Sequence, residues 1–138
     1  MAYQTGTASG TADLVNKLRA FGEAIGWVTN RSAHGVWHFR DAGSTMFFGI
    51  ENCTGQQAQH GADANIPANQ AIFLVNSTGY ASVPLKDQPG VEFGYLPTSQ
   101  RKVTSMELAP GSTGAGTYWF FGTTAYLHVV WARPEGTY

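Results

Sequence analysis

One segment near the N-terminus has the periodicity of an amphipathic helix, and it limits what the rest of the chain can fold into. Its apolar residues follow one another at spacings of four, three and four positions, which places them on one face: Leu14, Leu18, Phe21 and Ile25. Thr11 is a suitable N-cap, and Gly26 suits the left-handed position that follows a helix. Because the residues after Trp27 have the pattern of strands and loops, we expect this one helix to pack on β-sheet.

Asp13 and Lys17 lie four residues apart in the same segment. The carboxylate of Asp13 suits the positive end of the helix dipole, and the spacing predicts an ion pair with Lys17 on the helix surface. The residues before the helix are rich in Gly, Thr and Ser. We expect residues 1–10 to form a flexible leader and residues 11–138 to form a single β-rich domain, because a chain of 138 residues suffices for one core but not for two.

Two hairpins give the clearest strand signals. In the first, residues 36–40 and residues 45–50 are aromatic and β-branched, and the four residues between them are typical of a turn. Trp37 and Phe39 share one face of the first strand, which we expect to meet the helix. His38 lies on the opposite face, which we expect to be wetter.

The second hairpin joins residues 118–121 to residues 125–131 through a turn at residues 122–124. A further short apolar strand is predicted at residues 71–75, and residues 103–108 alternate weakly. The fold class predicted from these elements is α+β, mainly β. It consists of one N-terminal amphipathic helix packed on an antiparallel sheet or sandwich of hairpins with long loops.

Two long irregular stretches separate the predicted strands. Residues 54–70 are polar and have no periodicity, whereas residues 76–100 are too apolar for disorder and too interrupted by proline for regular strands. Loops of this kind are functional or are ordered by a neighbour, so we expect the interaction surface there. The candidate interaction residues are Tyr3, Tyr80, Leu85, Phe93, Tyr95 and Tyr126.

The composition limits the classes of partner. Only 12% of the residues are charged, about half the usual share, and the net charge is −1 with the basic residues scattered, which argues against a nucleic-acid partner. Cys53 is the single cysteine, so a disulfide framework and a thiolate zinc site are excluded. The sequence has no secretion signal and no membrane-spanning apolar run, and we expect a chain made in the cytoplasm that packs against partners through a neutral surface.

We find no motif for catalysis, and we expect a protein without enzymatic activity, cofactor or metal. The glycine-rich stretch at residues 111–116 lacks the lysine of a phosphate-binding loop and precedes a strand. His34 and His38 on a strand would lie roughly 13 Å apart, too far to share a zinc ion. His128 is expected to be a structural, hydrogen-bonded histidine within an apolar hairpin, and the acidic residues are spread singly.

Exposed aromatic residues on small glycine-rich β-domains also suit stacking on sugar rings. Trp119 and Phe121 fall where the second hairpin needs core side chains, so we expect them to be buried. Tyr80, Phe93, Tyr95 and Tyr126 are the freer aromatic residues. A host-surface glycan therefore stays a secondary possibility as a ligand.

Three parts of the chain together resemble a group of virion structural proteins of tailed bacteriophages. The parts are the Gly-Thr-Ala leader with the helix that ends in Gly26-Trp27, the Gln88-Pro89-Gly90 turn, and the aromatic hairpin of residues 118–131. The resemblance implies a non-enzymatic virion component, assembled in the host cytoplasm. It implies a place in the tail or baseplate and a protein present in several copies.

The partners implied are other virion proteins and further copies of this chain, docked through the long loops and the N-terminal arm. A glycan-binding receptor module of the tail and a capsid decoration protein are the alternatives. Members of the group continue beyond the final hairpin. Residues 133–138 are accordingly expected either to pair with another subunit or to lead into a longer product.

Overall fold

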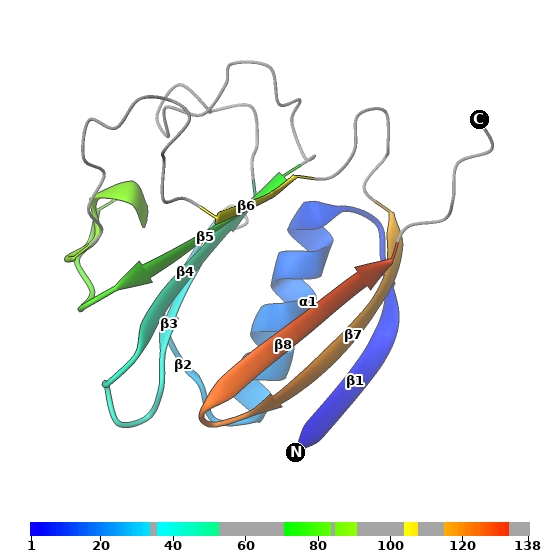
Figure 1. Ribbon diagram of the computed structural model, residues 1–138, viewed down its shortest axis with the longest axis horizontal. Helices are drawn as coiled ribbons and strands as arrows, with labels where there is room; N and C mark the ends of the chain where they lie inside the picture. The colour runs from blue at the N-terminus through cyan, green and yellow to red at the C-terminus, as the bar shows by residue number, and fades with distance from the viewer. Residues whose placement is uncertain (34–35, 53–70, 84, 91–103, 108–114, 133–138) are drawn as a thin grey trace.

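The computed structural model describes residues 1–33, 36–52, 71–83, 85–90, 104–107 and 115–132. They form one helix and two antiparallel sheets, so the predicted α+β, mainly β fold class is confirmed (Figure 1). The helix α1 (Thr11–Ala24) lies between the two sheets and contacts strands of both.

The smaller sheet has three strands in the order β1-β7-β8, namely β1 (Ala2–Ala8), β7 (Gly116–Thr123) and β8 (Tyr126–Ala132). The larger sheet has five strands in sequence order, namely β2 (Val28–Ala33), β3 (Val36–Arg40), β4 (Phe47–Asn52), β5 (Ala71–Ser77) and β6 (Thr104–Glu107). Every pairing is antiparallel. The two hairpins predicted from the sequence are β3-β4 and β7-β8.

The leader differs from its prediction as a flexible arm, because Ala2–Ala8 form strand β1. This strand pairs with β7 along its whole length, from Ala2 opposite Gly122 to Ala8 opposite Gly116. The Thr5 hydroxyl donates a hydrogen bond to the Tyr118 carbonyl oxygen at 2.8 Å. The leader has no charged residue and no cluster of aromatic residues. It forms a strand here because it pairs with the edge of β7 that β8 leaves free.

The N-cap of the helix lies one residue earlier than the sequence predicts. Gly10 occupies the N-cap, and Thr11 is the first helical residue, fully buried in the core instead of capping the helix. The predicted pair of Asp13 and Lys17 is confirmed at 2.7 Å, and the Asp13 carboxylate also accepts a hydrogen bond from the Ser9 amide at 2.9 Å. Gly26 has a φ of +100°, the left-handed geometry predicted for it.

The core lies where α1 meets both sheets. Phe21 of the helix packs against Phe120 of β7 with ring centroids 5.7 Å apart, and Trp37 stacks on Phe39 at 3.7 Å. The buried apolar residues come from the predicted helix face and from the inward face of each sheet: Leu14, Val15, Leu18, Phe21, Trp27, Trp37, Phe39, Ile50, Ile72, Tyr118 and Phe120. The helix therefore connects two sheets that have no strand in common.

The turns of the two hairpins have different determinants. In β3-β4, the Asp41 carboxylate accepts hydrogen bonds from the amides of Thr45 and Met46, both at 2.7 Å, which closes the turn. In β7-β8, the connecting residues are Thr124 and Ala125, so the turn begins two positions later and ends one position later than predicted. Gly122 belongs to the strand, where it pairs with Ala2 and Leu127, and a Cβ there would lie 2.6 Å from the Ile25 side chain at the end of the helix.

Candidate functional site

The outward face of the three-stranded sheet gathers exposed and half-buried aromatic side chains. Strand register places Tyr3, Phe121 and His128 in one row and Thr5, Trp119 and Val130 in the next. The Tyr3 and Phe121 rings are 5.0 Å apart, and Tyr126 meets His128 edge to face at 6.3 Å. We call this surface the outer aromatic face, defined as Tyr3, Thr5, Trp119, Phe121, Tyr126, His128 and Val130.

The outer aromatic face is open to solvent and carries no acidic residue, lysine or arginine. Tyr3 is 55% exposed, Tyr126 42% and Val130 47%. Patches of this kind are uncommon on monomeric proteins and are typical of binding surfaces.

The predictions for the residues on this face had mixed outcomes. Tyr3 and Tyr126 lie at the surface, as their choice as interaction residues requires. Trp119 and Phe121 were predicted to be core residues, but the prediction is wrong, since they alternate with the buried Tyr118 and Phe120. His128 was expected to be a hydrogen-bonded residue inside an apolar hairpin, yet it lies exposed on β8.

The remaining candidate interaction residues lie elsewhere or outside the described residues. Tyr80 is 39% exposed and packs beside the five-stranded sheet. Leu85, in the short helix η2 (Leu85–Asp87), is only 2% exposed and covers Gly49 of β4, so it does not belong to an interaction surface. Phe93 and Tyr95 lie outside the described residues, as do His34, His60, Cys53 and the predicted loop of residues 54–70.

His38 is the centre of a buried polar cluster on the face of β3 that was expected to be wetter. Its side chain is 0% exposed, so that expectation is wrong. The ring nitrogens lie 3.1 Å from the Asn30 amide nitrogen and 3.1 Å from the Ser77 hydroxyl, and the Tyr80 ring packs over it at 5.0 Å. Burial, with a smaller contribution from the Arg31 charge, lowers the pKa of His38 to about 4.

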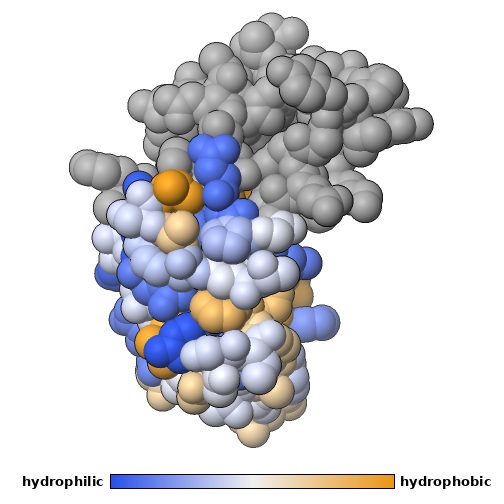
Figure 2. All heavy atoms as spheres, turned by 90° about the vertical axis from the view of Figure 1, so that its left-hand side faces the viewer, coloured by the Kyte–Doolittle hydropathy of each residue, from blue (hydrophilic) through white to orange (hydrophobic). Residues whose placement is uncertain are grey.

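Residues 78–83 and 85–90 cover this cluster. The Gln88 side chain bonds to both the amide and the carbonyl of Ala81 and to the Val83 carbonyl, at 2.8 to 2.9 Å. Arg31 donates to the same Val83 carbonyl at 3.0 Å. This part of the second predicted loop is therefore fixed to the sheet by its own polar groups. Figure 2 shows that side of the molecule as mostly hydrophilic or near-neutral in its described part.

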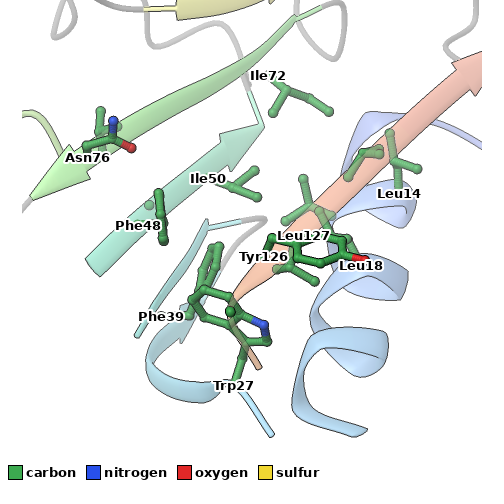
Figure 3. Close-up of a pocket in the computed structure, with 15 residues that line it drawn as sticks. Leu14, Leu18, Trp27, Phe39, Phe48, Ile50, Ile72, Asn76, Tyr126 and Leu127 are labelled. Carbon is green, nitrogen blue, oxygen red and sulfur yellow. The ribbon is translucent and has the colours of Figure 1, made fainter. Parts of the chain in front are cut away.

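An apolar cavity of about 420 Å³ opens between the two sheets (Figure 3). Strand β8 forms one wall, β4 and β5 form the other, and α1 closes the back. Its lining includes Leu14, Leu18, Trp27, Phe48, Ile72 and Leu127. The sequence gives no signal for this cavity, because it depends on the distance at which α1 holds the sheets apart.

Metal-binding side chains do not cluster in the described part of the chain. Within this part, no group of three His, Cys, Asp or Glu side chains could hold a metal ion. The described helix is also too short and too polar to cross a membrane. His38, the one described histidine that is buried, has a lowered pKa that keeps it neutral at physiological pH.

No protein-family model matches the chain, and no curated protein matches it significantly.

Proposed function

We propose that this protein is a structural component of a tailed bacteriophage particle, most consistent with the tail or baseplate, and that it binds neighbouring subunits through the outer aromatic face. The observation that carries the proposal is that face itself: Trp119, Phe121 and Val130 are presented side by side on a paired sheet. The resemblance of the sequence to virion structural proteins supplies the kind of particle.

The physical argument is that apolar surface left in water is unfavourable, and burying it against a neighbour contributes roughly 25 cal/mol per Å². Trp119 and Phe121 lie on the central strand of the sheet, between Thr5 and Tyr3 of β1 and Val130 and His128 of β8. A neighbouring subunit would thus meet preformed rings instead of ordering them on contact. Preformed contact groups reduce the entropy lost on association.

The free edges of the same sheet add a second means of association. Among the described residues, β1 and β8 each pair on one side only, with β7. Neither strand contains Lys, Arg, Asp, Glu or Pro, the residues that usually block an exposed edge. A strand of a neighbouring virion protein could pair there.

Labelling of particles tests the assignment. An antibody raised against this chain, detected with gold on purified phage, is expected to mark the tail or its tip. Label over the head would instead assign a capsid decoration protein. Absence of label from particles would reject a virion component.

A surface variant tests the role of the outer aromatic face. Trp119→Thr with Phe121→Thr keeps β-forming residues on β7 but removes both rings, and incorporation into particles is expected to fall. Asn16→Ala, on the exposed side of α1, is the matched control and is expected to leave incorporation unchanged. Equal incorporation of both variants, with the fold retained by circular dichroism, would contradict docking through this face.

A glycan-binding module is the second candidate, and the outer aromatic face favours it too, because aromatic rings gathered on one face of a sheet suit stacking on sugar rings. In this case Trp119→Ala should abolish weak binding to host-surface glycan in a titration. Tyr80→Ala, in the segment that follows β5 and away from the outer aromatic face, is the control. Loss of glycan binding in both variants, or absence of glycan binding in the unmodified protein, would argue against a sugar-binding surface at Trp119.

A further inference from the structure

The cavity between the sheets has the size and lining of a ligand site. Its volume of about 420 Å³ falls in the range of small-molecule sites, roughly 300 to 1,000 Å³. Phe48, Leu127 and Val129 line it and are only half-buried, so the cavity is open to solvent and not sealed in the core.

The described lining offers no charged side chain that could form an ion pair with an occupant, so the part of a ligand inside the cavity must be apolar. No Asp, Glu, Lys, Arg or His is among the described residues that line the cavity. The described lining residues with polar side chains are Asn76 on β5 and Tyr126 on β8, and both are exposed. Tyr126 begins β8 at the rim of the cavity, and its ring belongs to the outer aromatic face, so Asn76 is the polar group considered for a ligand. Within the described part of the chain, the Asn76 carboxamide has no hydrogen-bond partner, so it is available to a ligand.

The polar and apolar ends of the cavity are separated. The lining residues on β5 extend from Ile72 to Asn76, which in a strand is about 13 Å. Leu14 of α1 and Ile72 lie toward one end of the cavity, whereas Asn76 lies at the other end of β5 (Figure 3). A ligand that fits this arrangement is long, apolar over most of its length, and polar at one end.

We propose that the cavity binds a single-chain amphiphile, such as a medium-chain fatty acid or alcohol, with its alkyl chain along β5 and its polar end at Asn76. The proposal does not depend on the role in a phage particle. Alkyl chains suit this site because its inner wall is aliphatic, with Leu14, Leu18 and Ile72. Each added methylene should improve affinity about fourfold until the cavity is full.

Displacement of the neutral fluorescent probe N-phenyl-1-naphthylamine from the full chain tests the proposal. We expect saturable binding of the probe and its displacement by octanoate, decanoate and dodecanoate with increasing affinity, and by decanol. Leu127→Trp fills the cavity from β8 and should weaken binding by about tenfold or more. Asn16→Trp, at an exposed position of α1 that does not line the cavity, should leave binding unchanged.

A second variant keeps the test decisive if Leu127→Trp does not fold. Asn76→Asp places a carboxylate at the polar end, so it should weaken decanoate binding while leaving decanol binding nearly unchanged. Equal probe binding by the two tryptophan variants, or a uniform effect of Asn76→Asp on both ligands, would overturn the proposal. The proposal would also be overturned if the protein bound no amphiphile while Leu127→Trp still prevented its incorporation into particles. In that case a neighbouring chain would occupy the cavity.

Discussion

The indole nitrogen of Trp27 donates a hydrogen bond to the carbonyl oxygen of Thr123 at 2.9 Å, which joins the end of the helix to the last residue of β7. Trp27 is buried, and its ring meets Phe39 and Phe48 edge to face at 5.3 and 5.8 Å. One side chain thus contacts the inward face of the five-stranded sheet while it bonds to the backbone of the other sheet. The hydrogen bond and the ring contacts of Trp27 together set the distance between the two sheets at this end of the cavity.

Trp27→Phe is expected to lower the free energy of unfolding by about 1–3 kcal/mol, because it leaves the Thr123 carbonyl without its donor and removes part of a buried ring. Trp119→Phe is the control, since Trp119 lies on the outer aromatic face. Urea denaturation of both variants gives the comparison. A loss for Trp119→Phe as large as that for Trp27→Phe would contradict a specific role for the bond.

Gly22→Ala is expected to destabilise the protein even though alanine favours helices by about 1 kcal/mol over glycine. A Cβ at Gly22 would collide with the Trp37 ring, and overpacking of this kind costs about 1–3 kcal/mol. Ala20→Gly at an exposed position of α1 shows the effect of propensity alone. A higher melting temperature for Gly22→Ala would show that the contact relaxes without cost.

Asp41→Ala should lower the melting temperature more than Asp41→Asn, because asparagine keeps one oxygen for the amides of Thr45 and Met46. The amide of Met46 is the largest cause that lowers the pKa of Asp41. Because the folded pKa lies below the unfolded one, this stabilisation is present above about pH 4 and is lost as the pH falls further. Thermal melts of the wild type and both variants at pH 7 and pH 3 check this. The wild type should exceed Asp41→Ala by less at pH 3 than at pH 7, because only the wild type has a carboxyl group to titrate at this position.

His38 gives the protein a separate pH dependence at higher pH. Burial lowers the pKa of His38 from 6.5 to about 4, so the unfolded state binds more protons between these values. Stability is therefore complete above pH 6.5 and falls as the pH drops toward 4, by up to about 3 kcal/mol.

His38→Gln should remove this dependence while it retains groups that can bond to Asn30 and Ser77. Unfolding free energies of the wild type and the variant, measured at intervals between pH 4.5 and pH 7.5, give the difference directly. Parallel curves for the two proteins would mean that His38 does not titrate on unfolding. Carboxylates that titrate in this range affect both proteins alike, so they cancel in the comparison.

The local elements follow from short-range patterns that a sequence records. The spacing of Leu14, Leu18 and Phe21 predicts the buried face of α1, and the confirmed Asp13–Lys17 pair follows from the helical repeat. Gly26 ends the helix with positive φ. Both hairpins were found for the same reason, since their strands and turns are contiguous in the chain.

The site could be predicted only in part, because alternation in a strand does not say which face is buried. Residues 117–123 carry aromatic rings on both faces, so the sequence could not distinguish Trp119 and Phe121 from Tyr118 and Phe120. His38 became a core residue because residues 78–90, distant in sequence, supply Tyr80 to cover it.

By itself, the sequence determined the helix, the two hairpins and the uncharged character of the surface, because these depend on neighbouring residues and on composition. Only the tertiary structure decided which sheet each strand joins, that the Gly/Thr-rich leader becomes β1, and which aromatic rings face outward. It also created the cavity between β8 and β5. Those features arise from contacts between residues far apart in the chain, such as Trp27 with Thr123, which no local pattern encodes.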